Sequence, residues 1–224
     1  MTSDFQVLYI AVCEGNVKKV KRLMKPGVSI IAPDGEYSLF HPAAMNGRAN
    51  IIRALSTCKA DINTKSKNGA TPVLIASQTG HVDAIKALCA LGADVNIANN
   101  DGATPIFMAS RYGHLDAVKT LNELGANVNT PATDGTTPMC IAAQGCHLDT
   151  IKALYDIGAD LITPNSRGAS PLFMASFYGH VDAIKTLAAL GADVNTPATD
   201  GNTPICVAAQ GGCYKSFAYL GCRY

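Results

Sequence analysis

Histidine, aspartate and lysine recur together in this sequence at a constant spacing, and they are its best candidates for acid–base or metal chemistry. The histidines fall at intervals of 33 residues, at His81, His114, His147 and His180. An aspartate follows each histidine after two residues, and a lysine follows after five. Imidazoles and carboxylates serve as general acids, general bases and zinc ligands. A residue that recurs with every copy of a unit serves the unit itself, however. We therefore predict that the histidines are structural, that the aspartates are helix N-terminal charges, and that the lysines form a solvated row.

Other catalytic motifs are absent from the sequence. It holds neither a phosphate-binding Gly-x-x-x-x-Gly-Lys-Ser/Thr loop nor a Gly-x-Ser-x-Gly nucleophile elbow. Cys146 and His147 are adjacent, but neighbouring residues on a helix point in different directions, and no third partner is implied. We therefore expect a protein that is not an enzyme and that needs no cofactor and no metal.

The eight cysteines form no Cys-x-x-Cys pair. They are Cys13, Cys58, Cys89, Cys140, Cys146, Cys206, Cys213 and Cys222. Cys140 and Cys206 hold equivalent places 66 residues apart, which is too far for a disulfide in a stacked structure. No Asn-x-Ser/Thr glycosylation site occurs either. We expect buried, reduced and slowly reacting thiols in a cytoplasmic or nuclear protein, with Cys213 and Cys222 as the exceptions.

The overall composition limits the classes of partner. Apolar residues make up 48% of the chain, charged residues 16%, and the formal net charge is +1. This balance gives no basic field for nucleic acid. No apolar run approaches the roughly 18 residues of a membrane helix, and the apolar stretch 7–13 lacks the basic segment of a secretory signal. We expect no nucleic-acid binding, no membrane insertion and no secretion.

A repeat with a period of 33 residues runs along almost the whole chain. Its clearest marks are the pairs Thr71-Pro72, Thr104-Pro105, Thr137-Pro138, Ser170-Pro171 and Thr203-Pro204. Each copy holds two short apolar stripes, and helices this short cannot bury a stripe alone, so neighbouring copies must stack. The sequence therefore predicts an all-α solenoid.

Within one copy, the local signals place two helices and a loop. Thr104 has the side chain of an N-cap, and Pro105 suits the first helical position because its missing N–H costs nothing there. We predict helices over 105–112 and 115–124, each followed by a glycine that can adopt the left-handed conformation. Residues 126–134 are rich in Asn, Pro and Thr, and we expect an extended loop there.

These motifs make the chain resemble the ankyrin repeat family. A copy has Gly-x-Thr-Pro, an apolar run ending in Ala, Gly-His-x-Asp, and Gly-Ala-Asp-Val-Asn or a close variant. The resemblance implies about seven stacked helix-turn-helix modules with β-turn or hairpin loops. One departure is systematic, because only His41 keeps the histidine of the family's Thr-Pro-Leu-His motif. The replacements are Leu74, Phe107, Cys140, Phe173 and Cys206. We expect apolar packing to replace most of the hydrogen bonds of that histidine.

We treat residues 1–224 as a single domain of seven repeats. The predicted boundaries are 1–35, 36–68, 69–101, 102–134, 135–167, 168–200 and 201–224. The first repeat is degenerate, and we interpret its basic cluster at 18–25 as a solvated cap. In the second, Ser38-Leu39 replaces Thr-Pro, which predicts a less firmly started helix. In the fifth, Cys146 replaces a helix-ending glycine and Leu161-Ile162 replaces Val-Asn, which predicts a strained turn and a more apolar loop.

The positions that vary between repeats predict the binding surface. The two residues just before the glycine that ends each first helix differ from copy to copy, while the residues on either side of them stay constant. In the ankyrin family these places, together with the loop tips, form a concave binding face. The resemblance assigns partner binding to Gln78, Thr79, Arg111, Tyr112, Gln144, Phe177, Tyr178 and Gln210, and to the loop-tip residues Asn100, Asp101 and Arg167. We expect Arg111, Tyr112, Phe177 and Tyr178 to dominate, because interface hot spots are rich in Tyr and Arg. For Phe177 the alternative is packing against its own repeat.

The leading functional hypothesis is a non-catalytic scaffold that binds another protein, of unknown identity, through its concave face. The alternative is an ankyrin segment that acts as a structural spacer or as a fragment of a larger protein, and the stop at Tyr224 keeps this alternative open. An enzyme is the third class, and the absence of catalytic motifs argues against it.

Weak self-association is expected at the carboxyl end of the chain. Phe217, Tyr219 and Leu220 leave apolar surface where another repeat would normally stack, and such patches tend to associate. Light scattering at rising concentration should show a growing mass, or amide exchange should show fraying of residues 201–224. A strictly monomeric protein whose amides in 201–224 are as protected as those in 102–134 would contradict this expectation.

Overall fold

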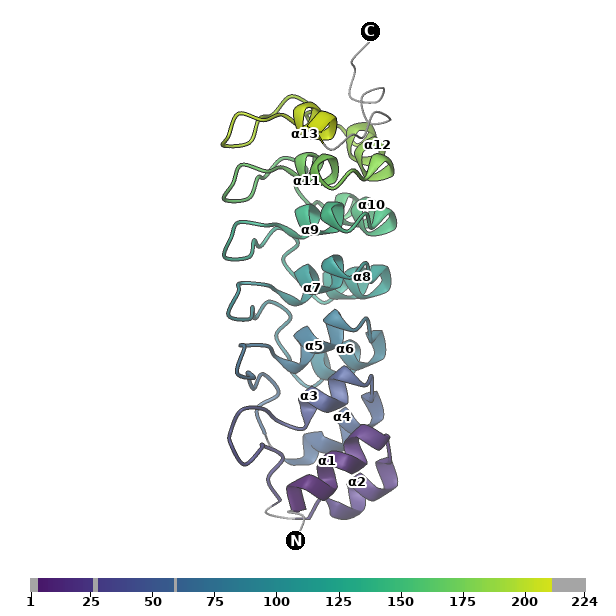
Figure 1. Cartoon of the computed structure of the whole chain (residues 1–224). Coiled ribbons are helices and arrows are strands. Elements are labelled where there is room, and N and C mark those ends of the chain that lie inside the picture. Colours follow the sequence, from purple (N-terminus) through teal and green to yellow (C-terminus); the bar gives the residue numbers. More distant parts are fainter. Residues whose placement is uncertain (1–3, 26–27, 59, 211–224) are drawn as a thin grey trace.

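The structure, a computed structural model, describes residues 4–25, 28–58 and 60–210 of the chain. Figure 1 shows two rows of short helices stacked along one axis, with loops that all project from the same flank. The inner row lies beside the loops, and each of its helices packs against its neighbours in the same row. From α1 to α11, each inner helix also packs against the outer-row helix that follows it in the chain. The predicted all-α repeat solenoid is confirmed.

The two rows alternate along the chain. The inner row comprises α1 (Asp4–Glu14), α3 (Phe40–Met45), α5 (Pro72–Gln78), α7 (Pro105–Arg111), α9 (Pro138–Gln144), α11 (Pro171–Phe177) and α13 (Pro204–Gln210). The outer row comprises α2 (Val17–Leu23), α4 (Ala49–Leu55), α6 (Val82–Cys89), α8 (Leu115–Glu123), α10 (Leu148–Asp156) and α12 (Val181–Ala189). A short 3-10 helix, η1 (Ser56–Cys58), follows α4. Within the described residues, the only strand-like pairing is an isolated antiparallel bridge between Ile31 and Ser38.

The inner helices start with the capping chemistry that the sequence predicts. In five of them a hydroxyl oxygen accepts a hydrogen bond from the amide three residues on, at 3.2–3.4 Å. The capping residues are Thr71, Thr104, Thr137, Ser170 and Thr203. A proline follows each cap. The helix α3 has no side-chain cap and begins only at Phe40, so its weaker start at Ser38-Leu39 is confirmed.

The helix ends agree with prediction to within one residue. Helix α7 ends at Arg111 and α8 at Glu123, because Tyr112 and Leu124 act as C-cap residues outside the helices. The apolar residues Ala117, Val118 and Leu121 of α8 are buried, whereas the C-cap residue Leu124, which follows the helix, is exposed.

The recurring histidines tie each repeat to the one before it. The ring Nε2 of His114 donates a hydrogen bond to the carbonyl oxygen of Gln78 at 3.0 Å. The other three histidines make the same bond 36 residues back, at 2.9–3.1 Å. The accepting carbonyl belongs to the last residue of an inner helix, which has no partner within its own helix. The predicted structural role of the histidines is confirmed. Arg48 holds the same place at the start of α4 and reaches the carbonyl of Cys13 at 3.4 Å.

This contact favours the glycines that follow α3, α5 and α7. Gly80 has a φ of 72°, and a Cβ there would lie 2.7 Å from the ring of His114 in the next repeat. Gly47 and Gly113 are similarly crowded by the following histidine. Cys146 is the one non-glycine residue with positive φ, at 56°, in the described part of the chain. The strained turn predicted there is confirmed, since such a conformation costs on the order of 1 kcal/mol.

The place that the family motif gives to histidine is filled in more than one way. His41 is buried and bridges the carbonyl of Ala70 and the residue Ser38. Leu74 and Phe107 are buried and pack together, as predicted. Cys140 departs from the prediction, because its Sγ lies 3.6 Å and 3.9 Å from two carbonyl oxygens, those of Thr163 and Ala169. Its thiol keeps a weak form of the hydrogen bond that an imidazole would make.

The loops are tied to each other by a ladder of asparagines. Asn129 donates to the carbonyl of Gly158 at 3.2 Å and accepts from the amide of Asp160 at 2.9 Å. Asn96 makes the equivalent two bonds one repeat earlier, and Asn63 makes them two repeats earlier. Ile162 occupies the next rung and makes neither bond, and its side chain is 59% exposed. The more apolar loop predicted for the fifth repeat is therefore also a gap in the ladder.

The two ends of the chain bear on three further expectations. Lys18, Lys21 and Arg22 are exposed, as expected for a solvated cap. The apolar residues invoked for self-association, Phe217, Tyr219 and Leu220, lie outside the described residues, as do Cys213 and Cys222. The division into seven repeats at the stated boundaries stays a prediction.

Replacing Ile162 by Asn is expected to complete the ladder. The new amide would reach the carbonyl of Gly191 and the amide of Asp193, which stand where Gly158 and Asp160 stand for Asn129. One intramolecular hydrogen bond contributes about 0.5–1.5 kcal/mol, so urea unfolding should show a gain of about 1 kcal/mol. The reciprocal variant Asn129→Ile should lose at least as much. Equal stability of both variants and the parent chain would contradict the role of the ladder.

Candidate functional site

The variable pairs lie at the C-terminal ends of the inner helices, where side chains leave the core. Tyr112 is 45% exposed, Phe177 60% and Tyr178 48%, and Arg111 is exposed as well. All four are outside the core. Phe177 also packs against rings of its own repeat, so the alternative of packing within that repeat stays open beside partner binding. It lies parallel to Phe173, with ring centroids 6.5 Å apart, and edge-on to Tyr178 at 5.3 Å.

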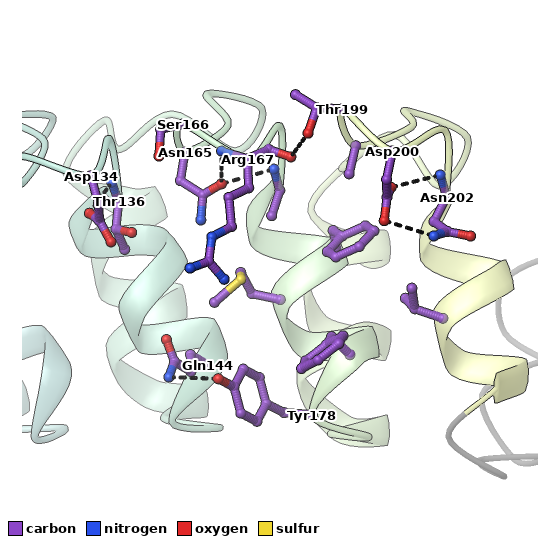
Figure 2. A pocket seen from close by; sticks show the side chains of 16 residues that line it. Asp134, Thr136, Gln144, Asn165, Ser166, Arg167, Tyr178, Thr199, Asp200 and Asn202 are labelled. Atoms are coloured by element: carbon purple, nitrogen blue, oxygen red, sulfur yellow. Dashed lines mark hydrogen bonds between the residues drawn. The ribbon is translucent and has the colours of Figure 1, made fainter.

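An open groove of about 640 Å³ runs across α9, α11 and α13 on this face. Figure 2 shows it bounded above by the loop tips and below by the ends of the inner helices. Four of the predicted residues line it: Gln144, Arg167, Phe177 and Tyr178. We call it the Arg167 groove. The structure thus brings together predicted residues from a helix end and from a loop tip.

The floor of the groove was not foreseen from the sequence. Phe173, Met174 and Val207 line it, and together with Ala169 and Ala198 they form a small apolar cluster separate from the main core. The signal was present, because the place of Met174 is held by Ile75, Met108, Ile141 and Val207 in other repeats. Sequence alone does not say whether this aliphatic position, which recurs in every one of these repeats, faces the main core or the loops.

The remaining predicted residues lie outside the groove, and several already have structural partners. Thr79 turns its hydroxyl back to the carbonyl of Ile75 at 2.9 Å. Asn100 donates to the carbonyl of Lys67 at 3.2 Å and so joins two loop tips. Tyr112 stacks on the ring of His114. Gln78, Asp101 and Arg111 are likewise absent from the groove lining. The side chain of Gln210 lies outside the described residues.

Charge is unevenly distributed in the groove. Asp134 accepts from the amide of Thr136 at 2.9 Å, which folds its carboxylate into its own turn. Asp200 accepts from both the amide and the side chain of Asn202, at 2.9 and 2.8 Å. These bonds lower the pKa of Asp200, the backbone amide contributing most. Arg167, between the two, makes no ion pair within the described residues.

The thiols are less uniform than expected. Of the six cysteines in the described residues, all are free, but only Cys140 is buried. Cys206 is exposed, although it holds the same repeat position as Cys140, because no loop of a following repeat covers it among the described residues. The expectation of buried thiols is therefore wrong for Cys206 and only partly met at Cys13, Cys58, Cys89 and Cys146, which are half-buried.

Two other kinds of site were sought in the described part of the chain. No group of three histidine, cysteine or acidic side chains lies close enough there to hold a metal ion. None of the helices that the structure describes has both the length and the apolar character to cross a bilayer.

Comparison with known proteins identifies the repeat. The family model described as Ankyrin repeats (3 copies) matches residues 40–132, 127–198 and 163–223. These matches together span most of the chain and include the whole Arg167 groove. A comparison with curated proteins gave no match.

Among the six described cysteines, Cys206 is expected to react first with a maleimide, and Cys140 last. Hydrogen bonds from Thr203, its hydroxyl above all, lower the pKa of Cys206, so this exposed thiol holds more of the reactive thiolate near neutral pH. Burial raises the pKa of Cys140, and burial with nearby Asp94 raises that of Cys89 to about 11. Mass spectrometry after brief labelling of the native protein measures the order. Labelling of Cys140 as early as Cys206 would overturn this assignment.

Proposed function

Because the chain belongs to the ankyrin repeat family, we propose that it is a non-catalytic scaffold that holds a partner protein against its inner, loop-side face. Ankyrin repeats generally mediate protein–protein interaction. The fold supplies a rigid stack in which positions one period apart face the same side, so single residues from several repeats form one surface.

The observation that carries this proposal is the exposure of large aromatic side chains on that face. Tyr112, Phe177 and Tyr178 project from the ends of α7 and α11 while the rest of these helices is mostly buried. Exposed aromatic rings are costly on a surface that only meets water, and they supply rigid contact area in interfaces. Two repeats separate the tyrosines, a span of roughly 20 Å if each repeat is one helix diameter thick.

The free thiols support an intracellular location for this scaffold. The six described cysteines include no disulfide, and reduced thiols are typical of cytoplasmic and nuclear proteins. We accordingly propose a cytoplasmic protein that works in a reducing compartment.

Removing either tyrosine is expected to weaken partner binding while sparing the fold. Tyr112→Ala or Tyr178→Ala should cost roughly 1–3 kcal/mol of affinity, the range of an interface hot spot. Thermal unfolding should shift little, since surface substitutions usually change stability by about 0.5 kcal/mol or less. Affinity purification from the native cell with each variant as bait, followed by titration of the recovered partner, measures both effects.

A matched control lies on the opposite side of the molecule. Tyr155 is 42% exposed on the outer helix α10, so Tyr155→Ala removes an equally accessible phenol from the face that is not proposed to bind. It should capture the partner normally. If Tyr155→Ala weakens capture as much as Tyr178→Ala, or if the inner-face variants bind normally but unfold several degrees early, the binding face is misplaced.

A further inference from the structure

We infer that the Arg167 groove receives an extended segment of the partner in which an acidic side chain stands beside a bulky apolar one. This inference rests on the proposed function and adds the chemistry of the partner. The groove runs across three successive inner helices, from Gln144 on α9 to Val207 on α13. A chain that follows it passes several repeats, which suits an internal segment of a protein better than a chain end.

Arg167 carries a positive charge at a loop-tip position that is acidic or neutral in the other repeats. Asn68, Asp101, Asp134 and Asp200 hold the tip position in other repeats, so Arg167 is a reversal of charge. Its backbone is fixed on both sides, since its amide donates to Asn165 at 3.0 Å and its carbonyl accepts from Thr199 at 2.8 Å. Figure 2 shows the side chain running from the tip down into the groove, with the guanidinium group above Gln144.

The guanidinium group of Arg167 has no partner among the residues that the structure describes. None of its N–H groups is bonded to a described residue, and it makes no ion pair with one. The nearby carboxylates of Asp134 and Asp200 are engaged by the amides of their own turns. Arginine presents a planar fork of donors that matches a carboxylate in a two-point contact. An incoming Asp or Glu side chain therefore complements what the groove leaves unsatisfied.

Apolar surface lies beneath the charge. Phe177 is 60% exposed, whereas Gln78, Arg111 and Gln144 hold the same position in other repeats. The ring continues the apolar floor of Phe173, Met174 and Val207. This is the place in the groove where a large apolar side chain of the partner removes the most surface from water.

Gln144 and Tyr178 offer hydrogen-bonding groups to the backbone of the bound segment. Gln144 donates its side-chain N–H to the hydroxyl oxygen of Tyr178 at 3.2 Å. That bond leaves the amide oxygen of Gln144 as an acceptor and the Tyr178 O–H as a donor. An extended peptide offers both N–H and C=O groups along its length, and these two side chains suit one of each.

A peptide selection tests the inference on the intact chain. Random dodecapeptides displayed on phage are selected on the full-length protein and counter-selected on its Phe177→Ala variant. We expect enriched peptides to carry Asp or Glu one or two places from Phe, Trp or Leu. Enrichment of Lys or Arg instead would overturn the inference in favour of recognition by Asp134 and Asp200. Failure to enrich any sequence would overturn it as well, while partner capture with Tyr178→Ala still decides the proposed function independently.

Charge reversal in the protein and in the peptide then tests whether Arg167 contacts the acidic residue of the peptide. Arg167→Glu should weaken an enriched acidic peptide by roughly tenfold or more, since like charges placed together are strongly unfavourable. Lys152→Glu makes the same change of charge on the exposed outer side of α10 and should leave affinity unchanged. A peptide with its acidic residue changed to Lys should bind Arg167→Glu better than the parent chain. Equal loss in both protein variants, or no recovery with the reversed peptide, would overturn the contact.

Discussion

The inner helices α3, α5, α7 and α9 end with carbonyl groups that their own turns cannot satisfy, and a histidine of the next repeat binds the last carbonyl of each. The Nε2–H of His114, for example, reaches the last carbonyl of α5. A Cβ at Gly80 would lie 2.7 Å from that ring, so a glycine suits this place, although Cys146 fills the equivalent place while His180 keeps its bond to Gln144. A single helix pair has neither this bond nor a neighbour to cover its apolar stripe. Because each repeat needs the next one for both, the stack folds cooperatively.

The same constraint leaves the binding surface free to vary. The module fixes its caps, its glycines, its histidines and the two buried rows, whereas the last side chains of α5, α7, α9 and α11 are exposed or half-buried. Repeats with Gln or Arg there keep the same backbone as the repeat with Phe177. Single substitutions at these positions can therefore change which partner is bound, at little cost to folding. The specificity of the array comes from the combination of side chains that successive repeats present.

Most of the fold could be predicted from the sequence, but only four of the predicted binding residues line the groove. The period, the Thr-Pro caps and the recurring glycines predict the helices to within a residue, because each is a local signal with one physical meaning. The exposed aromatic pair at Phe177 and Tyr178 was predictable for the same reason. The floor at Met174 was not, since an aliphatic residue on a helix suits the main core and the loop-side cluster equally. The exposure of Cys206 was missed because it depends on what stacks next, not on its own position.

The central claim is that the partner lies on the inner face around the end of α11. A photo-crosslinking amino acid substituted for Phe177, with a second chain carrying it in place of Tyr155, tests this directly in the native cell. The account predicts a discrete covalent adduct with another protein from position 177 and none from position 155. An adduct of equal yield from position 155, or from 155 alone, would contradict the account and move the interface to the outer helices.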